Sequence, residues 1–285
     1  MLNVTFFRKN WFKGLLLLLG VINIGILVFA GLRPDQLEHI YFLNVGQGDA
    51  TLIKTVNNHY ILIDGGPDDS VISQIDSIMP PWHRQLDLVV LTHPHADHAT
   101  GLLSVLSRYQ VNQFWYTGTT YNSETYQALV ASVTAKQIPI QLANRGDNYV
   151  LDDTNLRVIF PIEERPIAKD PNETSVVGLL NYQGLDVLFT GDASANNEKA
   201  YVSDIPDVDV IKVPHHGSQT ASSPILVNQA RSEMGVISVG SNNSFGHPHP
   251  DTVAHYESLG VKLYRTDEGM VELITDGKSY QVYQR

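Results

Sequence analysis

The amino-acid sequence predicts an α/β domain at residues 36–285, preceded by a separate hydrophobic segment at residues 1–35. Short apolar runs alternate with stretches of helical periodicity through the larger part. No internal repeat, low-complexity tract or long linker interrupts this part after His39. The whole chain has 285 residues and is 43% hydrophobic, so it can bury a substantial core. We therefore expect a single globular domain after the first segment.

The order of the expected elements favours a layered fold. Strands are grouped first, strands and helices then alternate, and this order occurs twice. This order is compatible with two sheets packed face to face with helices outside, and it is also compatible with a single mixed sheet. Apolar runs predict strands at His39–Val45, Ala50–Val56, Tyr60–Ile63, Leu86–Leu91, Gln113–Tyr116, Leu156–Phe160, Ser175–Tyr182, Asp186–Phe189, Val208–Val213, Val236–Val239, Val261–Tyr264 and Met270–Thr275. Helices are expected at about 70–79, 99–109, 123–137, 195–202, 224–232 and 251–259.

The first segment predicts a membrane anchor. Three basic residues precede Gly14–Leu32, a run of 19 residues that is interrupted only by Asn23. Its length is close to the roughly 20 residues that cross a bilayer. Basic residues on the N-terminal side predict that this end stays in the cytoplasm and that the rest is exported. The alternative is a cleaved signal peptide with secretion, because Ala30 offers a small residue at a cleavage site.

The charge of the exported part bears on its partners. All 30 acidic residues and 15 of the 19 basic residues follow Pro34, which leaves a net charge of −15. Such a field repels nucleic acid unless local basic groups or metal ions compensate for it. Trp82, Trp115 and the 13 tyrosines do not interleave with basic residues, so no stacking platform for single-stranded nucleic acid is visible.

The stretch LTHPHADHATGL, residues 91–102, concentrates three histidines and an aspartate within six positions. His93 and His95 follow an apolar strand at a spacing of two, so both imidazoles point the same way and can reach one ion. Asp97 and His98 follow in a turn or a helix start, and they can meet a second ion. The chain has no cysteine, so a metal must be held by histidine and carboxylate. This cluster predicts a metal site.

Further residues that can bind a metal follow other apolar strands. Asp192 ends DVLFTGD, where Gly191 permits a tight turn, and its carboxylate could bridge two ions. His215 and His216 end DVDVIKVPHHGS. Asp64 ends HYILIDGG and is a candidate for orienting a metal-bound imidazole by accepting its other N–H. Each aspartate alone could be a turn residue, but their joint appearance after separate strands favours one shared site.

HPHADH, with Asp64, Asp192 and His215 in this order, resembles the metallo-β-lactamase superfamily of binuclear hydrolases. Within it the chain is similar to the C-terminal hydrolase domain of ComEC/Rec2 competence proteins, over about residues 38–275. The resemblance implies an αβ/βα four-layer sandwich with metals at one edge of the sheets. Its matching stretches are FLNVGQGDATLI, ILIDGG, LDLVVLTHPHADHATGL, NETSVV, VLFTGD, KVPHHGS, SVGSNNSFGHPHPDTV and LYRTDEGMVEL.

The resemblance also implies a ligand set for two divalent ions, Zn²⁺ or Mn²⁺. The first ion would be bound by His93 and His95, the second by Asp97, His98 and His215, and Asp192 would bridge them. His216 would lie close by. The superfamily usually supplies a third histidine to the first ion, but this chain has no histidine between His98 and His215. Asn172 of NETS is the nearest positional match, and binding of one ion only remains an alternative.

Other residues are candidates for contacts with substrate. His247 of FGHPHP could touch a substrate phosphate or donate a proton to a leaving group, so that Asp97, Asp192 and His247 are the expected catalytic residues. His249 is a further candidate, unless Pro-His-Pro only shapes a turn. Ser218 could bind phosphate or cap a helix. Asp49 of GQGDA could line the site or sit in a glycine-rich hairpin turn.

These observations favour a metal-dependent hydrolase outside the cytoplasm, acting on phosphodiesters as a phosphodiesterase or nuclease, with DNA as one candidate substrate. Because no polytopic channel segment is present, we expect a stand-alone relative of the competence proteins, and any part in DNA uptake is left open. The alternatives are a phosphorylcholine-esterase-like cell-wall hydrolase and a non-catalytic, membrane-anchored binding module with a degenerate metal site. Hydrolysis of β-lactams is disfavoured by the missing histidine and cysteine, and flavo-diiron chemistry by His95, where a carboxylate would be needed.

Overall fold

The computed structural model describes residues 11, 13–23, 25, 35–163 and 169–285. The chain divides into two compact units, residues 1–36 and residues 37–285. In the first unit, residues 13–23 are helical and their side chains are exposed. Among the helices that the described residues form, none is long and apolar enough to cross a membrane. Residue 24 and residues 26–32 of the expected anchor lie outside the described residues, so the anchor stays a prediction.

Two large sheets dominate the described part of the second unit. In spatial order, the first consists of β17 (Tyr280–Gln284), β16 (Val271–Thr275), β1 (Glu38–Phe42), β2 (Thr51–Lys54), β3 (Tyr60–Ile63), β5 (Leu88–Val90), β7 (Phe114–Tyr116) and β8 (Ile140–Leu142). The second consists of β15 (Lys262–Arg265), β14 (Met234–Ile237), β13 (Val210–Lys212), β12 (Leu185–Phe189), β11 (Val177–Tyr182), β10 (Thr154–Phe160) and β9 (Asn148–Leu151). β4 (Gln85–Leu86) and β6 (Gln110–Val111) form a small separate pair.

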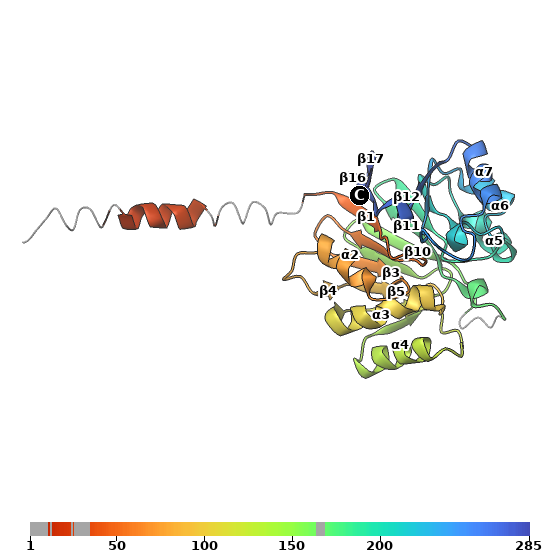
Figure 1. The fold of residues 1–285 in the computed structure, drawn as a ribbon, viewed down its shortest axis with the longest axis horizontal. Helices are drawn as coiled ribbons and strands as arrows, with labels where there is room; N and C mark the ends of the chain where they lie inside the picture. The colour runs from red at the N-terminus through yellow and green to blue at the C-terminus, as the bar shows by residue number, and fades with distance from the viewer. Residues whose placement is uncertain (1–10, 12, 24, 26–34, 164–168) are drawn as a thin grey trace, which may run out of the picture. The chain divides into compact units, whose positions relative to one another are not determined.

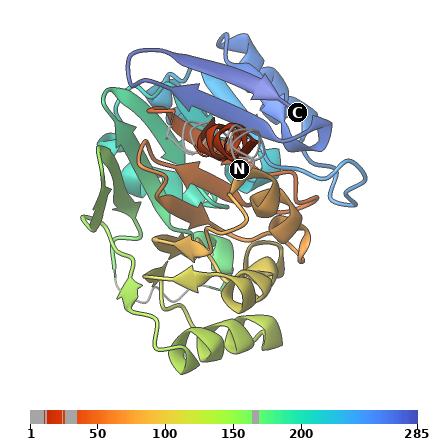
Figure 2. The ribbon, with the colours of Figure 1, turned by 90° about the vertical axis from the view of Figure 1, so that its left-hand side faces the viewer.

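Helices cover the outer face of each sheet, so the domain has four layers (Figures 1 and 2). Helices α2 (Ser70–Ile78), α3 (Ala96–Arg108) and α4 (Glu124–Ala135) pack on the first sheet. Helices α5 (Ala195–Tyr201), α6 (Pro224–Ala230) and α7 (Pro250–Ser258) pack on the second. Single 3-10 turns lie at η1 (Pro171–Thr174), η2 (Val202–Asp204), η3 (Pro214–Gly217) and η4 (Thr266–Glu268). The two-sheet alternative of the sequence analysis is therefore the correct one.

Burial on both faces of the sheets explains why the central strands are almost continuously apolar. All four residues of β3 are buried. Tyr60 and Leu62 pack under the helices of the first sheet, whereas Ile61 and Ile63 pack between the sheets. Side chains alternate along a strand, so a strand that is covered on both faces needs apolar residues at every position. The same arrangement stacks three hydrophobic clusters through the four layers.

Three strands of the two large sheets, β8, β9 and β17, were not expected from the sequence. No residue of these strands is buried. They stand at or beside the edges of the sheets, where hydrogen bonds to one neighbour hold a strand without an apolar pattern. Helix α3 begins at Ala96, three residues before the expected start. This earlier start matters for function, because it places Asp97 and His98 in the first helical turn.

Candidate metal centre

The site lies where parallel strands of both sheets end. β3 and β5 run parallel in the first sheet, and β12 and β13 run parallel in the second. Parallel neighbours bring their carboxyl ends to the same edge of a sheet. Asp64 and His93 follow the first pair, whereas Asp192 and His216 follow the second. The two edges meet, since Nε2 of His93 lies 3.9 Å from Oδ2 of Asp192.

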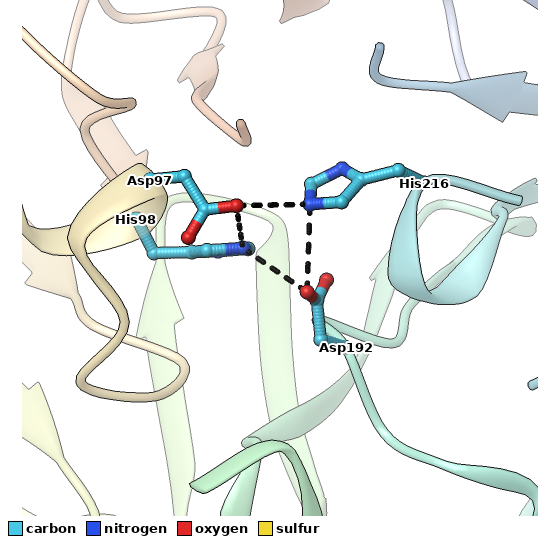
Figure 3. Close-up of side chains that lie close together, drawn as sticks. All are labelled: Asp97, His98, Asp192 and His216. Atoms are coloured by element: carbon cyan, nitrogen blue, oxygen red, sulfur yellow. Dashed lines mark ion pairs between the residues drawn. The ribbon is translucent and has the colours of Figure 1, made fainter. Parts of the chain in front are cut away.

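Four side chains converge at the centre of the site (Figure 3). One potential ligand atom from each of Asp97, His98, Asp192 and His216 lies within 4.8 Å of the others. Oδ2 of Asp192 is 3.4 Å from Nε2 of His98 and 3.4 Å from Nε2 of His216. Oδ2 of Asp97 is 3.3 Å from Nε2 of His216 and 4.0 Å from Nε2 of His98.

The donor set at this centre fits a divalent ion. Among the described residues, Nε2 of His98, Nε2 of His216 and Oδ1 of Asp192 are buried atoms without a hydrogen-bond partner. Buried polar atoms are costly to leave unpaired, so each such atom calls for an explanation. Imidazole nitrogens and carboxylate oxygens in this arrangement are the ligands that zinc and manganese accept.

Asp64 fixes the orientation of His98. Nδ1 of His98 donates to Oδ2 of Asp64 across 2.8 Å, which leaves the lone pair on Nε2 facing Asp192. Asp64 is itself held by Thr92, whose backbone N–H and hydroxyl donate to its two carboxylate oxygens at 2.8 and 2.7 Å. The carboxylate of Asp64 thus holds the imidazole of His98 through Nδ1 and leaves Nε2 free to face the centre of the site.

His216 is oriented by a second buried group. Its Nδ1 donates to the carbonyl oxygen of Ser238 across 2.9 Å and lies 3.4 Å from Oδ1 of Asp49. Asp49 also pairs with the buried ammonium of Lys212. Burial opposes ionisation of Asp49, but Lys212 and His216 outweigh it and lower the pKa of this carboxyl to about 2. The sequence did not point to Lys212, although a lysine inside the apolar strand β13 was the available signal.

The central group contains His216, whereas the sequence favoured His215 for the second ion. The two adjacent histidines both adopt left-handed backbone angles, with φ of 51° and 54°. Neighbouring residues of a helical turn point in different directions. Nε2 of His215 instead lies 3.9 Å from Oδ2 of Asp192 and 3.3 Å from Nδ2 of Asn172, outside the central group.

Comparison with known proteins decides the family of this fold and site. The description "Metallo-beta-lactamase superfamily" matches residues 43–240, which is more than half of the chain. The chain belongs to the metallo-β-lactamase superfamily. This confirms the resemblance carried by HPHADH and its partner residues.

Individual relatives confirm the resemblance to competence proteins. The chain is 24% identical to ComE operon protein 3 of Bacillus subtilis over 245 residues, covering 79% of the chain and 31% of the relative. It is 29% identical to Recombination protein 2 of Haemophilus influenzae over 211 residues, covering 73% and 25%. The chain thus spans a third or less of the length of these relatives. The metallo-β-lactamase fold protein YhfI of Bacillus subtilis superposes with a TM-score of 0.55 at 12% identity, covering 87% of the chain and 99% of YhfI.

His93 and His95 lie beside the central group. Nε2 of His93 and Nδ1 of His95 lie 3.0 Å apart, so both imidazoles face one point as their spacing predicts. Asn172 is buried beside His215, and its Oδ1 has no hydrogen-bond partner among the described residues. Asn172 and His215 therefore lie side by side next to Asp192.

A pocket of about 450 Å³ opens over the centre. His247 lines it, with its ring centroid 5.8 Å from that of His215 and 6.5 Å from that of His216. Burial, reinforced by the nearby His216 and His215, lowers the pKa of His247. The described residues that line this pocket are Gln47, Pro67, His95, Ala96, Asp97, Asn172, Asp192, His215, His216, Phe245 and His247.

Two substrate candidates from the sequence are not part of this lining. His249 caps helix α7, where its Nδ1 accepts from the backbone N–H of Asp251 across 3.3 Å. The hydroxyl of Ser218 bonds to that of Thr220 across 3.0 Å. In this structure His249 caps a helix and Ser218 bonds within its own loop, so neither side chain lines the pocket. Phe245, which the sequence analysis did not single out, does line the pocket.

Proposed function

We propose that this superfamily member is a metal-dependent phosphodiesterase of the nuclease type that acts outside the cytoplasm. The observation that carries the proposal is the central group of Asp97, His98, Asp192 and His216, with His93 and His95 beside it. The similarity to competence proteins favours a phosphodiester substrate, with DNA as the candidate. The intact central group favours an enzyme over a binding module with a degenerate site.

Divalent ions at this site would activate water near neutral pH and stabilise negative charge on a phosphoryl oxygen. Asp97, His98, Asp192 and His216 would hold one ion, and His93 and His95 would hold another. Burial opposes protonation of His98 and His216, but Asp192 and the other nearby carboxylates outweigh it and raise the pKa of both imidazoles above 6.5. Protons therefore compete with the metal, and binding should weaken as the pH falls.

We infer that His247 acts on the leaving group. It lines the pocket above the central carboxylate and histidines and belongs to neither metal group. Burial and the neighbouring imidazoles of His216 and His215 lower its pKa. The negative charge of a bound phosphodiester would favour the imidazolium form, which can donate a proton to the departing oxygen.

The test is hydrolysis by the purified full chain, loaded with Zn²⁺ or Mn²⁺ or stripped with a chelator. We expect cleavage of single-stranded DNA and of bis(p-nitrophenyl) phosphate that depends on metal, with measured ion content. Asp97→Ala should lower the rate by at least about 100-fold, since it removes a ligand that organises the reaction. Asp207→Ala is the matched control, because its carboxylate is exposed and pairs with exposed Arg231. A folded protein that takes up no metal and stays inactive after incubation with Zn²⁺ or Mn²⁺, or full activity of Asp97→Ala, would refute the proposal.

A further inference from the structure

Phe245 is an exposed aromatic side chain at a polar site. It is 68% exposed, and yet it lines the same pocket as Asp97, Asp192 and His216. A single exposed apolar residue on a surface needs no explanation. A large apolar ring beside a metal-type centre does call for one, because it contributes nothing to binding ions or phosphate. Its position suggests contact with an apolar part of the substrate.

The ring of Phe245 lies nearly parallel to a neighbouring ring. It stacks on the imidazole of His247, with ring centroids 6.0 Å apart and planes inclined by 16°. Asn243 stabilises the loop that carries both rings. The amide nitrogen of Asn243 donates to the carbonyl oxygens of Gly240 and His247 at 2.9 and 2.7 Å, and its amide oxygen accepts from the N–H of His247 at 3.0 Å. The ring is therefore positioned before any ligand arrives.

The residues that line the pocket offer few charged groups that could recognise a substrate anion. No lysine or arginine is found among the described residues that line it. The domain after Pro34 carries a net charge of −15. Binding along a polyanionic backbone relies on several such cations. Recognition of one nucleotide unit, by its phosphate at the centre and by a flat group beside it, suits this pocket better.

We propose that Phe245 is a specificity residue that stacks on a nucleobase next to the phosphodiester being cleaved. The proposal rests on the proposed function and deepens it by naming a residue that recognises the base of the substrate. Bases stack on aromatic side chains without sequence preference, because every base has a flat π face. A quaternary ammonium group such as choline is instead recognised by a cage of several aromatic rings. Phe245 is the only Phe, Tyr or Trp among the described residues that line the pocket.

The experiment compares two substrates that differ only in the base. The metal-loaded full chain is given a thymidine trinucleotide and its abasic tetrahydrofuran analogue, which has the same charged backbone. We expect kcat/KM to favour the trinucleotide by about 10- to 100-fold, the range that loss of one stacked base produces. In Phe245→Ala and Phe245→Leu this ratio should fall toward one, whereas Phe245→Trp should keep it. A ratio that survives in Phe245→Ala, or a wild-type ratio near one, overturns the proposal.

A binding measurement separates this proposal from the proposed function. The fluorescence of Phe245→Trp, measured against wild type, should be quenched by the trinucleotide and not by the abasic analogue, whether or not cleavage occurs. If neither substrate is cleaved but this difference is present, the enzyme proposal fails and the stacking proposal stands. Quenching by glycerophosphocholine instead of the trinucleotide would overturn stacking in favour of an ammonium ligand. Because Phe245 is exposed, unchanged thermal unfolding of Phe245→Ala serves as the folding control.

Discussion

His215 and His216 are adjacent in the chain and face different parts of the site. His216 is buried, and its Nδ1 is held by Ser238 and Asp49, so its Nε2 is directed at Asp97 and Asp192. His215 is partly exposed and lies beside Asn172. Histidine pairs of this kind cannot be told apart by residue type. Their roles follow from the hydrogen bond that the other ring nitrogen makes.

Substitution of each histidine should separate these roles. In His216→Ala, affinity for the ion bound by Asp97, His98 and Asp192 should fall by more than the about 10- to 100-fold that loss of an outer partner costs. His215→Ala, the matched control, should leave the binding of this ion within that range. Calorimetric titration with Zn²⁺ or Mn²⁺, together with ion content by mass spectrometry, measures both. Equal losses in the two variants would contradict the assignment of His216.

At the scale of elements, strand β1 carries an unusual buried carboxyl group. Glu38 is fully buried and accepts a hydrogen bond from the hydroxyl of Thr154 across 2.5 Å. Burial raises the pKa of Glu38 from 4.5 to about 8; the Thr154 hydrogen bond opposes this shift, and the neighbouring Asp152 and Asp153 add to it. Below pH 4.5 the group is neutral in both the folded and the unfolded chain. Between pH 4.5 and 8 only the unfolded chain releases the proton, so stability falls as the pH rises.

Glu38→Gln should remove this dependence, because the amide is neutral at every pH. We expect the variant to unfold at a temperature several degrees above wild type at pH 8, for a gain on the order of a few kcal/mol. The difference should shrink steadily toward pH 4.5. Thermal unfolding across this pH range measures it, with Glu163→Gln, a change outside the strands, as the control. A difference between variant and wild type that does not change with pH would refute the raised pKa of Glu38.

At the scale of the whole molecule, the apolar run 14–32 and the acidic remainder are two separate features of one chain. The chain divides into two compact units after Gln36. We propose that residues 1–35 anchor the chain in the membrane and that the hydrolase domain lies outside the cytoplasm. The three basic residues ahead of the apolar run support this orientation.

The anchor can be tested in cells. The full chain should sediment with membranes, resist extraction with high salt and be released by detergent. Added protease should degrade the domain in spheroplasts, or in intact cells without an outer membrane, whereas a cytoplasmic marker should stay intact. A chain lacking residues 1–35 serves as the comparison. A mature N-terminus shortly after Ala30 would show a cleaved signal peptide, and protection of the domain from protease would show the opposite orientation.

Most of the fold was predictable because burial on both sheet faces leaves long apolar runs in the sequence, as in β3 and β5. Strands β8, β9 and β17 were not, since hydrogen bonds to a neighbour hold them without an apolar pattern. In the site, the sequence pointed to Asp64 and Asp192 at strand ends and to Asp97 and His98 in a turn or helix start, and the structure brings Asp97, His98 and Asp192 together with Asp64 bonded to His98. Lys212 and Phe245 were missed, because a buried ion pair and an exposed ring depend on residues far away in the chain.

The sequence by itself determined the superfamily and the chemical types of the site, because local spacing and strand ends decide which ligand types gather at a sheet edge. Only the tertiary structure decided that two sheets face each other, that His216 rather than His215 joins Asp97, His98 and Asp192, and that Phe245 lines the pocket. These outcomes depend on the packing of distant segments and on backbone angles. Neither the packing of distant segments nor the backbone angles produce a periodicity or a residue spacing that can be recognised in the sequence.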